Sequence, residues 1–130
     1  MSRCVIDTNA VVYYLNQVGG EDFRQRFGLW VRDGAVISVV TRIEVLSWPE
    51  YSTNLAALIR AEALLSTLYE EPLTEPIVRE TILLRQAYRL KVPDALVAAT
   101  AQILTLPVVT RNIDDFRRIP NLQLIDPFIN

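Results

Sequence analysis

Several acidic side chains in this sequence stand directly after apolar segments or at the start of expected helices. Asp7 follows residues 3–6, Glu44 lies just past residues 35–40, and Asp94 opens the segment DALVAATA. Asp115 lies in TRNIDDF, residues 110–116, after a further apolar segment. Carboxylates within several ångströms of one another repel and raise each other's pKa unless a cation neutralises them. If the fold brings these four together, they predict a divalent metal site, and oxygen ligands favour Mg²⁺ or Mn²⁺.

The residue types that are missing restrict the chemistry further. The chain has no histidine, and Cys4 is its only cysteine. A Ser-His or Cys-His couple, an imidazole acid or base and a Cys/His zinc site are therefore excluded. Hydrolysis would have to rely on carboxylates, lysine, tyrosine or a metal held by oxygen atoms. A water on Mg²⁺, oriented by a carboxylate, can attack a phosphodiester in line, so the pattern indicates a nuclease.

Each acidic side chain also has an ordinary structural explanation. Asp7 can be a turn residue before a helix that Asn9 caps. Residues 41–44, TRIE, match a capping box in which Glu44 binds the backbone amide of the cap. The others can be helix-start residues: Asp94 after Pro93, and Asp115 three residues after Asn112. All of them fall on the same predicted sheet edge, and we favour a functional site for that reason.

The segments that must position these side chains alternate between strands and helices. Apolar runs predict strands at residues 3–6, 35–40, 106–110 and 122–125. Helical spacing and breaker residues predict helices at residues 10–15, 21–33, 41–48, 54–70, 75–90 and 94–104, with room for a short edge strand at 70–76. Parallel strands need crossover connections, so the alternation predicts an α/β/α sandwich of three layers around a parallel sheet of four to five strands. Ligands bind such sheets at the carboxyl ends of the strands.

Composition sets the class of protein. A chain of 130 residues with 51% hydrophobic residues fits one domain, residues 1–130. Thirteen basic residues against fifteen acidic ones argue against a protein that coats nucleic acid through bulk positive charge. The apolar runs are too short to cross a membrane, and no basic-then-apolar leader opens the chain. We expect a cytoplasmic protein without a membrane partner.

Four segments together resemble PIN-domain proteins, specifically the VapC-type toxin ribonucleases of prokaryotic toxin–antitoxin pairs. They are VIDTNAVVYYL, ISVVTRIEVLSWP, KVPDALVAATA and VVTRNIDDFRRIPNLQLIDP, and they cover essentially the whole chain in the family's order. The resemblance implies the PIN fold, a Mg²⁺-dependent endoribonuclease that cleaves cellular RNA, a homodimer, and a small cognate antitoxin that silences it. It makes Asp7, Glu44 and Asp94 the metal-binding core, with Thr8 and Asn9 in support.

The chain departs from the family at the fourth acidic position. Many relatives carry an aspartate two residues after Thr110, where this chain has Asn112. An amide can bind a metal or donate a hydrogen bond but brings no charge. Some relatives use the acid just before the phenylalanine, which here is Asp115. We therefore expect Asp115 to be the fourth catalytic carboxylate, with Thr110 and Asn112 supporting the site or positioning substrate.

Other side chains have two open interpretations. Arg111, Arg117 and Arg118 flank the last acidic motif; they can contact RNA phosphates, or be solvated or paired with Asp114 and Asp115. The large aromatic residues can fill the core or line a groove for an antitoxin peptide or a second subunit; these are Trp30, Trp48 and Tyr51.

Three functions other than a nuclease agree with part of the sequence. A haloacid-dehalogenase-like phosphatase needs a second aspartate where Asn9 stands, and a receiver-type domain needs a lysine after a late strand, whereas the sole lysine, Lys91, precedes a helix. The stronger rival is a catalytically silent PIN-like module that only binds RNA or a protein, which Asn112 would permit. The intact core carboxylates argue against it.

Overall fold

Five short strands form one parallel sheet in the computed structural model, which describes residues 3–129. The strands are β1 (Val5–Ile6), β2 (Val36–Ser38), β3 (Tyr69–Glu71), β4 (Val108–Val109) and β5 (Leu124–Ile125). Their order is β3-β2-β1-β4-β5, and each neighbouring pair is parallel. The predicted parallel sheet of four to five strands is confirmed. Because β1 lies in the centre, the residues that follow β1, β2 and β4 reach the same edge.

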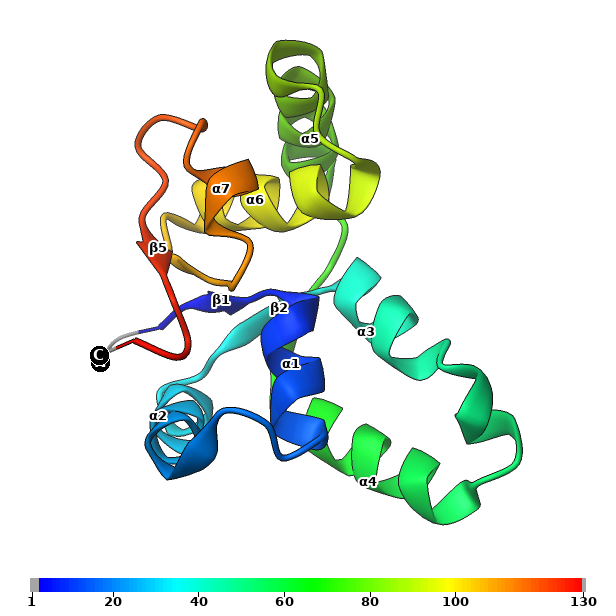
Figure 1. Cartoon of the computed structure of the whole chain (residues 1–130). Helices are drawn as coiled ribbons and strands as arrows, with labels where there is room; N and C mark the ends of the chain where they lie inside the picture. Colours follow the sequence, from blue (N-terminus) through cyan, green and yellow to red (C-terminus); the bar gives the residue numbers. More distant parts are fainter. Residues whose placement is uncertain (1–2, 130) are drawn as a thin grey trace.

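Helices cover both faces of this sheet (Figure 1). One face carries α1 (Thr8–Leu15), α2 (Gly20–Arg32) and α4 (Leu55–Leu65), and the other carries α5 (Glu75–Tyr88), α6 (Val92–Leu104) and α7 (Ile113–Phe116). Successive strand residues point to opposite faces. Ile6, Ile37 and Val109 belong to the first core, and the second core takes their neighbours Val5, Val36 and Val108. The predicted α/β/α sandwich is therefore confirmed.

Helix α1 begins two residues earlier than the sequence suggests. Asp7 is its N-cap, with extended backbone, and Asp7 Oδ1 accepts a hydrogen bond from the Thr8 backbone amide at 2.8 Å. The prediction that Asn9 caps this helix is wrong, because Asp7 already satisfies the first free amide and Asn9 lies inside the first turn. The side chain of Asn9 is left to make longer-range contacts.

Helix α3 (Val39–Leu46) also begins earlier than predicted. Ser38 is its N-cap, and Ser38 Oγ accepts a hydrogen bond from the Val40 amide at 3.0 Å. The predicted capping box of Thr41 and Glu44 is therefore wrong, because these residues lie within the helix. The predicted strand at 35–40 is correspondingly shorter. Since Glu44 has no capping role, its carboxylate can serve the site.

Helix α4 is shorter than its apolar pattern predicts. It stops at Leu65 rather than continuing to residue 70, and β3 takes up residues 69–71. The Tyr69 amide donates to the Ala35 carbonyl oxygen at 2.9 Å, so pairing with β2 overrides the local helical pattern. A 3₁₀ turn, η1 (Pro49–Ser52), joins α3 to α4, and α3 ends before Pro49 as expected.

Within residues 3–129, no helix combines the length and the apolar character needed to cross a bilayer.

Candidate metal centre

Asp7 follows the central strand and is almost completely buried, at 6% exposure. Its Oδ2 accepts hydrogen bonds from Thr110 Oγ1 at 2.8 Å and from Asn9 Nδ2 at 3.2 Å. With the Thr8 amide on Oδ1, three donors fix the carboxylate. Thr110 follows β4, which neighbours β1, so the parallel register brings residues 103 positions apart together.

A hydrogen-bonded network joins the turn after β1 to the turn after β4. The Arg111 amide donates to Asn9 Oδ1 at 3.2 Å, and the Asn112 amide donates to Thr110 Oγ1 at 2.9 Å. Asn9 Nδ2 also lies 3.3 Å from Thr110 Oγ1. The structure thus places Asn9 and Thr110, both expected to support the site, directly against Asp7.

Glu44 reaches the same edge from α3. Thr8 Oγ1 donates a hydrogen bond to Glu44 Oε1 at 2.6 Å and lies 3.1 Å from Thr41 Oγ1. Thr41 is fully buried between α1 and α3. The two threonines therefore link the first turn of α1 to α3 and hold Glu44 beside Asp7.

Burial, with repulsion from neighbouring acids as a smaller cause, raises the pKa values of Asp7 and Asp94. Burial raises the pKa of Asp7 to about 6; the charges of Asp94 and Glu44 add to this, and hydrogen bonds from Thr110 and Thr8 oppose it. Burial also raises the pKa of Asp94, and the charges of Asp115 and Glu44 add to that increase, while Lys91 lowers it. The four predicted carboxylates therefore lie close enough to influence one another.

The fourth acidic position is shared between an amide and a carboxylate. Asn112 is the N-cap of α7, and its Nδ2 donates a hydrogen bond to Asp115 Oδ2 at 2.9 Å. Asn112 lines the cavity, and Asp115 is its partner one helical turn away. Asp115 thus supplies a negative charge near Asp94, at the position where Asn112 supplies none.

Asp7, Glu44 and Asp94 face a cavity of about 360 Å³, whereas Asp115 is not among its lining residues. Its lining consists of Asp7, Thr8, Asn9, Val12, Tyr13, Glu44, Asp94 and Asn112. Among residues 3–129, no group of three acidic or cysteine side chains is arranged closely enough to hold a metal ion as it stands. Mg²⁺ keeps several waters in most protein sites, so it needs fewer direct ligands than a closed cage. The oxygen-only donors and their unbalanced repulsion fit a hydrated Mg²⁺ ion.

The predicted phosphate-binding arginines have different surroundings. Arg111 Nη1 lies 2.8 Å and 3.0 Å from the two oxygens of Asp126. Arg117 pairs with Asp114 at 3.0 Å, one of the two alternatives that the sequence left open. Arg118 is exposed and forms no ion pair within the described residues.

Sequence reasoning missed three residues around the site. Thr41 touches Thr8, and Tyr13 lines the cavity one helical turn after Asn9, so helical spacing could have indicated it. Asp126, the partner of Arg111, directly follows the strand predicted at residues 122–125, so the strand-end pattern used for Asp7 could have indicated it.

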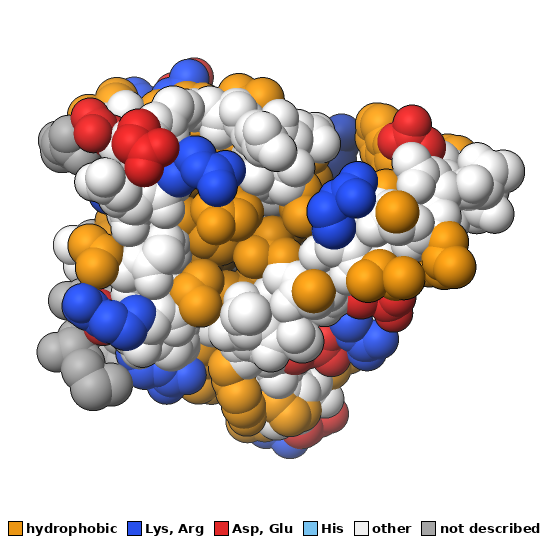
Figure 2. Space-filling view, turned by 90° about the horizontal axis from the view of Figure 1, so that it is seen from below, with side chains coloured by type: hydrophobic (Ala, Val, Ile, Leu, Met, Phe, Trp, Pro, Cys, Tyr) orange, Lys and Arg blue, Asp and Glu red, His pale blue; other side chains and the backbone are white. Residues whose placement is uncertain are grey.

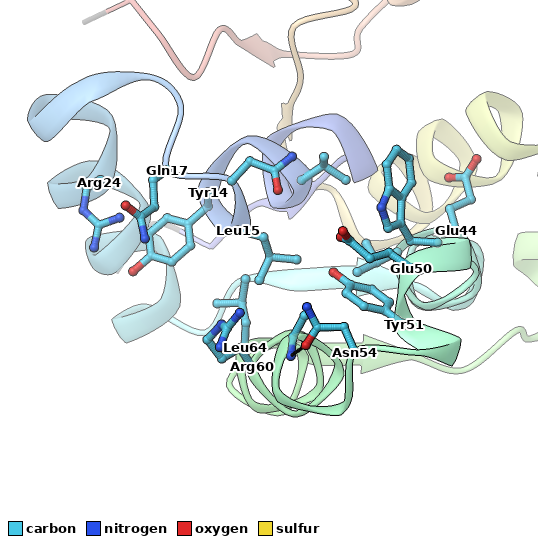
Figure 3. Close-up of a pocket in the computed structure, with 15 residues that line it drawn as sticks. Tyr14, Leu15, Gln17, Arg24, Glu44, Glu50, Tyr51, Asn54, Arg60 and Leu64 are labelled. Carbon is cyan, nitrogen blue, oxygen red and sulfur yellow. Dashed lines mark hydrogen bonds between the residues drawn. The ribbon is translucent and has the colours of Figure 1, made fainter.

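A second cavity, of about 410 Å³, lies between α1, α2, α3, η1 and α4, and we call it the α1–α4 groove. It shares Val12 and Glu44 with the first cavity. Figure 2, which views the molecule from the α2 and α4 side, shows a hollow lined by hydrophobic side chains with Lys or Arg side chains on both sides. Figure 3 shows Arg24 beside Tyr14 at one side of the groove and Glu44 at the opposite side.

The tryptophans divide between the core and this groove. Trp30 packs against the first core, with its ring 6.5 Å from that of Phe23 and 6.3 Å from that of Phe27. Trp48 is 60% exposed and lines the groove together with Tyr51. Of the two interpretations that the sequence left open, Trp30 therefore fills the core, and Trp48 lines the groove.

Comparisons with solved structures agree with the fold. The chain is 30% identical to a chain in a toxin–antitoxin complex from Klebsiella pneumoniae, with a TM-score of 0.77 over 95% of this chain and 97% of the other. It is 25% identical to a chain in DNA-bound VapBC from Salmonella typhimurium, with a TM-score of 0.79 over 98% and 99%. VapBC2 from Rickettsia felis, bound to a promoter DNA fragment, gives a TM-score of 0.82 at 23% identity over 95% and 97%.

Comparison with sequence families assigns the chain directly. A comparison with curated protein sequences found no match. The PIN domain family model, in contrast, matches residues 4–122, which include all four candidate carboxylates and the network around Asp7. The matched region contains β1 to β4 and the acidic edge described above, and β5 follows it. The chain belongs to the PIN domain family.

Proposed function

We propose that this protein is a Mg²⁺-dependent endoribonuclease and the toxin of a type II toxin–antitoxin pair. The observation that carries the proposal is the nearly buried carboxylate of Asp7, held by three hydrogen bonds near Glu44 and Asp94 at an open cavity. Holding these charges together is unfavourable, as the raised pKa values of Asp7 and Asp94 reflect. Carboxylates with raised pKa values in a cavity are typical of functional sites.

In this proposal Asp7, Glu44 and Asp94 hold the ion. When bound, Mg²⁺ lowers the pKa of a coordinated water and offsets the charge that develops on the scissile phosphate. Thr8 orients Glu44 through its 2.6 Å hydrogen bond. Asp115 contributes a further negative charge, while Mn²⁺ substitutes for Mg²⁺ because it accepts the same oxygen ligands.

The proposed substrate is RNA, in line with the resemblance to VapC-type toxins. Arg117 and Arg118 follow α7 directly and are the proposed phosphate contacts. The ion pair between Arg117 and Asp114 is exposed, and such pairs contribute little, so a phosphate can replace Asp114 as the partner. Arg111 is less accessible for this role because Asp126 already binds its guanidinium group.

We propose that a segment of a cognate antitoxin occupies the α1–α4 groove. The toxin–antitoxin complex from Klebsiella pneumoniae supports a partner of this kind. Arg24 and Arg60 line the groove without an ion pair in the described chain, so they suit acidic groups of the partner. Glu44 and Glu50 also line it and suit a basic group. A basic side chain at Glu44 would compete with the metal and silence the enzyme.

We also propose a cytoplasmic homodimer. Exposed apolar side chains on the adjoining elements α3 and α4 support an interface; they are Ile43, Leu55 and Ile59. Light scattering of the purified protein should give twice the mass of the chain. A monomer at the concentrations where the protein is active would contradict the dimer.

The test of the catalytic proposal uses purified protein and total cellular RNA. With Mg²⁺ or Mn²⁺, sequencing of RNA ends should reveal cleavage sites that are absent with a chelator and absent with Asp94→Asn. Equal cleavage by the variant, or cleavage that a chelator does not affect, would refute the metal site. RNA binding without cleavage by the metal-loaded wild type would instead identify a silent PIN-like module.

The toxin role needs a test in cells. Expression of the protein alone should arrest growth, and co-expression of a short reading frame from beside its gene should relieve the arrest. Arrest by Asp94→Asn protein at the same expression level would show that growth inhibition does not depend on the carboxylates.

A further inference from the structure

The last described residues of the chain are attached to the candidate site through Arg111. Residues 126–128, which we call the C-terminal clasp, lie beyond residues 4–122, the part that the PIN family model matches. Both carboxylate oxygens of Asp126 bind Arg111 Nη1, and Asp126 Oδ1 also accepts the Phe128 amide at 3.0 Å. The side chain of Asp126 is 17% exposed and that of Arg111 is 40% exposed, so this ion pair is partly shielded from solvent.

Phe128 packs the clasp against helices α1 and α2. Its ring lies 5.0 Å from the Tyr13 ring and 5.2 Å from the Phe23 ring, and the Arg111 guanidinium carbon lies 4.8 Å from its centre. Gly19 permits this packing, because a Cβ atom there would lie only 2.6 Å from the Phe128 ring. The aromatic contacts and the cation–π contact hold Phe128 and Arg111 together.

The backbone of Arg111 carries this attachment to the catalytic carboxylate. Its amide donates to Asn9 Oδ1, and the Asn9 amide group donates to Asp7 Oδ2. Asn9 can make both bonds only when the turn after β4 keeps its present position. A continuous chain of contacts therefore connects Asp126 with Asp7.

We propose that the C-terminal clasp positions the catalytic carboxylate, and that Asp126 is a positioning residue that acts through Arg111 and Asn9. Arg111 then serves as the anchor of the turn and not as a phosphate contact. This inference rests on the proposed nuclease function for its kinetic readout, but its structural readout does not depend on catalysis.

The chain offers a matched control for the stability of the clasp. Arg26 in α2 donates to the Pro127 carbonyl oxygen at 2.8 Å and to the Asp126 carbonyl oxygen at 3.4 Å. Arg26→Gln weakens the attachment of the clasp to α2 and leaves the Arg111–Asp126 pair in place. Asp126→Asn weakens that pair and leaves Arg26 in place. A purely structural role of the clasp predicts similar effects for the two variants.

The structural experiment measures hydrogen exchange by NMR in metal-free protein. Asp126→Asn should speed exchange of the Arg111 amide at least about 10-fold and shift the Asn9 side-chain amide signals. Arg26→Gln should change both much less, because the Arg111–Asp126 pair and the Phe128 contacts still hold the clasp beside Arg111. Unchanged exchange in Asp126→Asn, or equal acceleration in both variants, would overturn the proposal whether or not the protein cleaves RNA.

The kinetic experiment separates positioning from phosphate binding. Asp126→Asn should lower kcat about 10- to 100-fold, the scale expected for a misplaced catalytic group, with KM for RNA changed less than about twofold. The swapped double variant Arg111→Asp/Asp126→Arg should recover most of kcat. Three results would assign Arg111 to RNA binding and refute the positioning role of the clasp. Asp126→Asn would raise KM and leave kcat unchanged, and the salt dependence of RNA binding would weaken by about one phosphate contact. The swapped double variant would not recover kcat. If the wild type cleaves no RNA, the nuclease proposal fails and the exchange experiment alone decides the clasp.

Discussion

Replacement of Asp7 by asparagine should abolish cleavage and, at the same time, stabilise the protein. Burial and the neighbouring carboxylates raise the pKa of Asp7 from 3.8 to about 6 in the folded state. At neutral pH the ionised carboxylate is therefore less favourable in the folded chain than in the unfolded one. One pKa unit corresponds to about 1.4 kcal/mol, so the penalty is about 3 kcal/mol.

Asparagine removes this penalty but loses part of the hydrogen bonding. Its amide nitrogen would face the donor Asn9 Nδ2, at a cost of about 1 kcal/mol. The net gain of about 2 kcal/mol in the free energy of unfolding corresponds to a rise in Tm of about 7 °C, at an unfolding entropy of about 2.1 cal/mol/K per residue. Activity should fall at least about 100-fold, since the metal loses a charged ligand.

The stability difference between the wild type and Asp7→Asn should depend on pH. The folded state holds more protons than the unfolded state between pH 4 and 6, because the folded pKa of Asp7 is the higher one. The wild type should therefore lose stability as the pH rises through this window, and Asp7→Asn should lose less, with the raised pKa of Asp94 still contributing. Their Tm values should converge towards pH 4 and differ most above pH 6.

The assay is thermal unfolding at several pH values with a chelator present. Asp114→Asn is the matched control, because it removes an exposed carboxylate whose ion pair with Arg117 contributes little; its Tm should change by no more than about 2 °C. Saturating Mg²⁺ should raise the Tm of the wild type but not that of Asp7→Asn. A lower Tm of Asp7→Asn at pH 7.5 would refute the reasoning that Asp7 is held at an energetic cost.

Three further predictions concern single positions. Thr8→Val removes the hydrogen bond to Glu44, so kcat should fall about 10-fold with little change in Tm, as measured by RNA cleavage and thermal unfolding. Gly19→Ala places a Cβ atom 2.6 Å from two aromatic rings at a φ of +107°, so denaturant unfolding should show a loss of about 2 kcal/mol or more, and unchanged stability would contradict this packing. Asn112→Asp adds a carboxylate beside Asp115, so calorimetry should show tighter Mg²⁺ binding, whereas weaker binding would argue that Asn112 is required to orient Asp115.

The general arrangement of the site was predictable because it depends on local patterns. Strands and helices that alternate along the chain require a parallel sheet, and its carboxyl edge then collects the residues that follow the strands. Asp7 could be placed in this way, and Asp94 could be placed by its position at the start of the helix that leads back to β4. The position of Glu44 was right although its helix boundary was wrong, since a helix that starts two residues earlier still leads away from the same strand end.

Helix caps and strand ends were harder to predict because several neighbouring residues are suitable N-caps. Ser38 and Thr41 are both good N-cap residues, and the sequence does not show which one follows the last paired strand residue. Pairing of β2 with β3 continues to Ser38, so the strand ends there and Ser38 becomes the cap. The same long-range pairing places residues 69 and 70, expected as the end of a helix, in the edge strand β3, for which the sequence left room only from residue 70 onward.

The sequence by itself determined which functional groups this protein has available: oxygen donors without histidine, in four acidic motifs on a parallel α/β chain. Only the tertiary structure decided how these groups are oriented. Asn9 and Thr110 bind Asp7, Asn112 turns towards Asp115, and Arg111 binds Asp126. Several of these contacts join residues far apart in the chain, where local pattern carries no information. Residue type follows from the sequence directly, whereas the direction of a side chain depends on the partners that the whole fold brings to it.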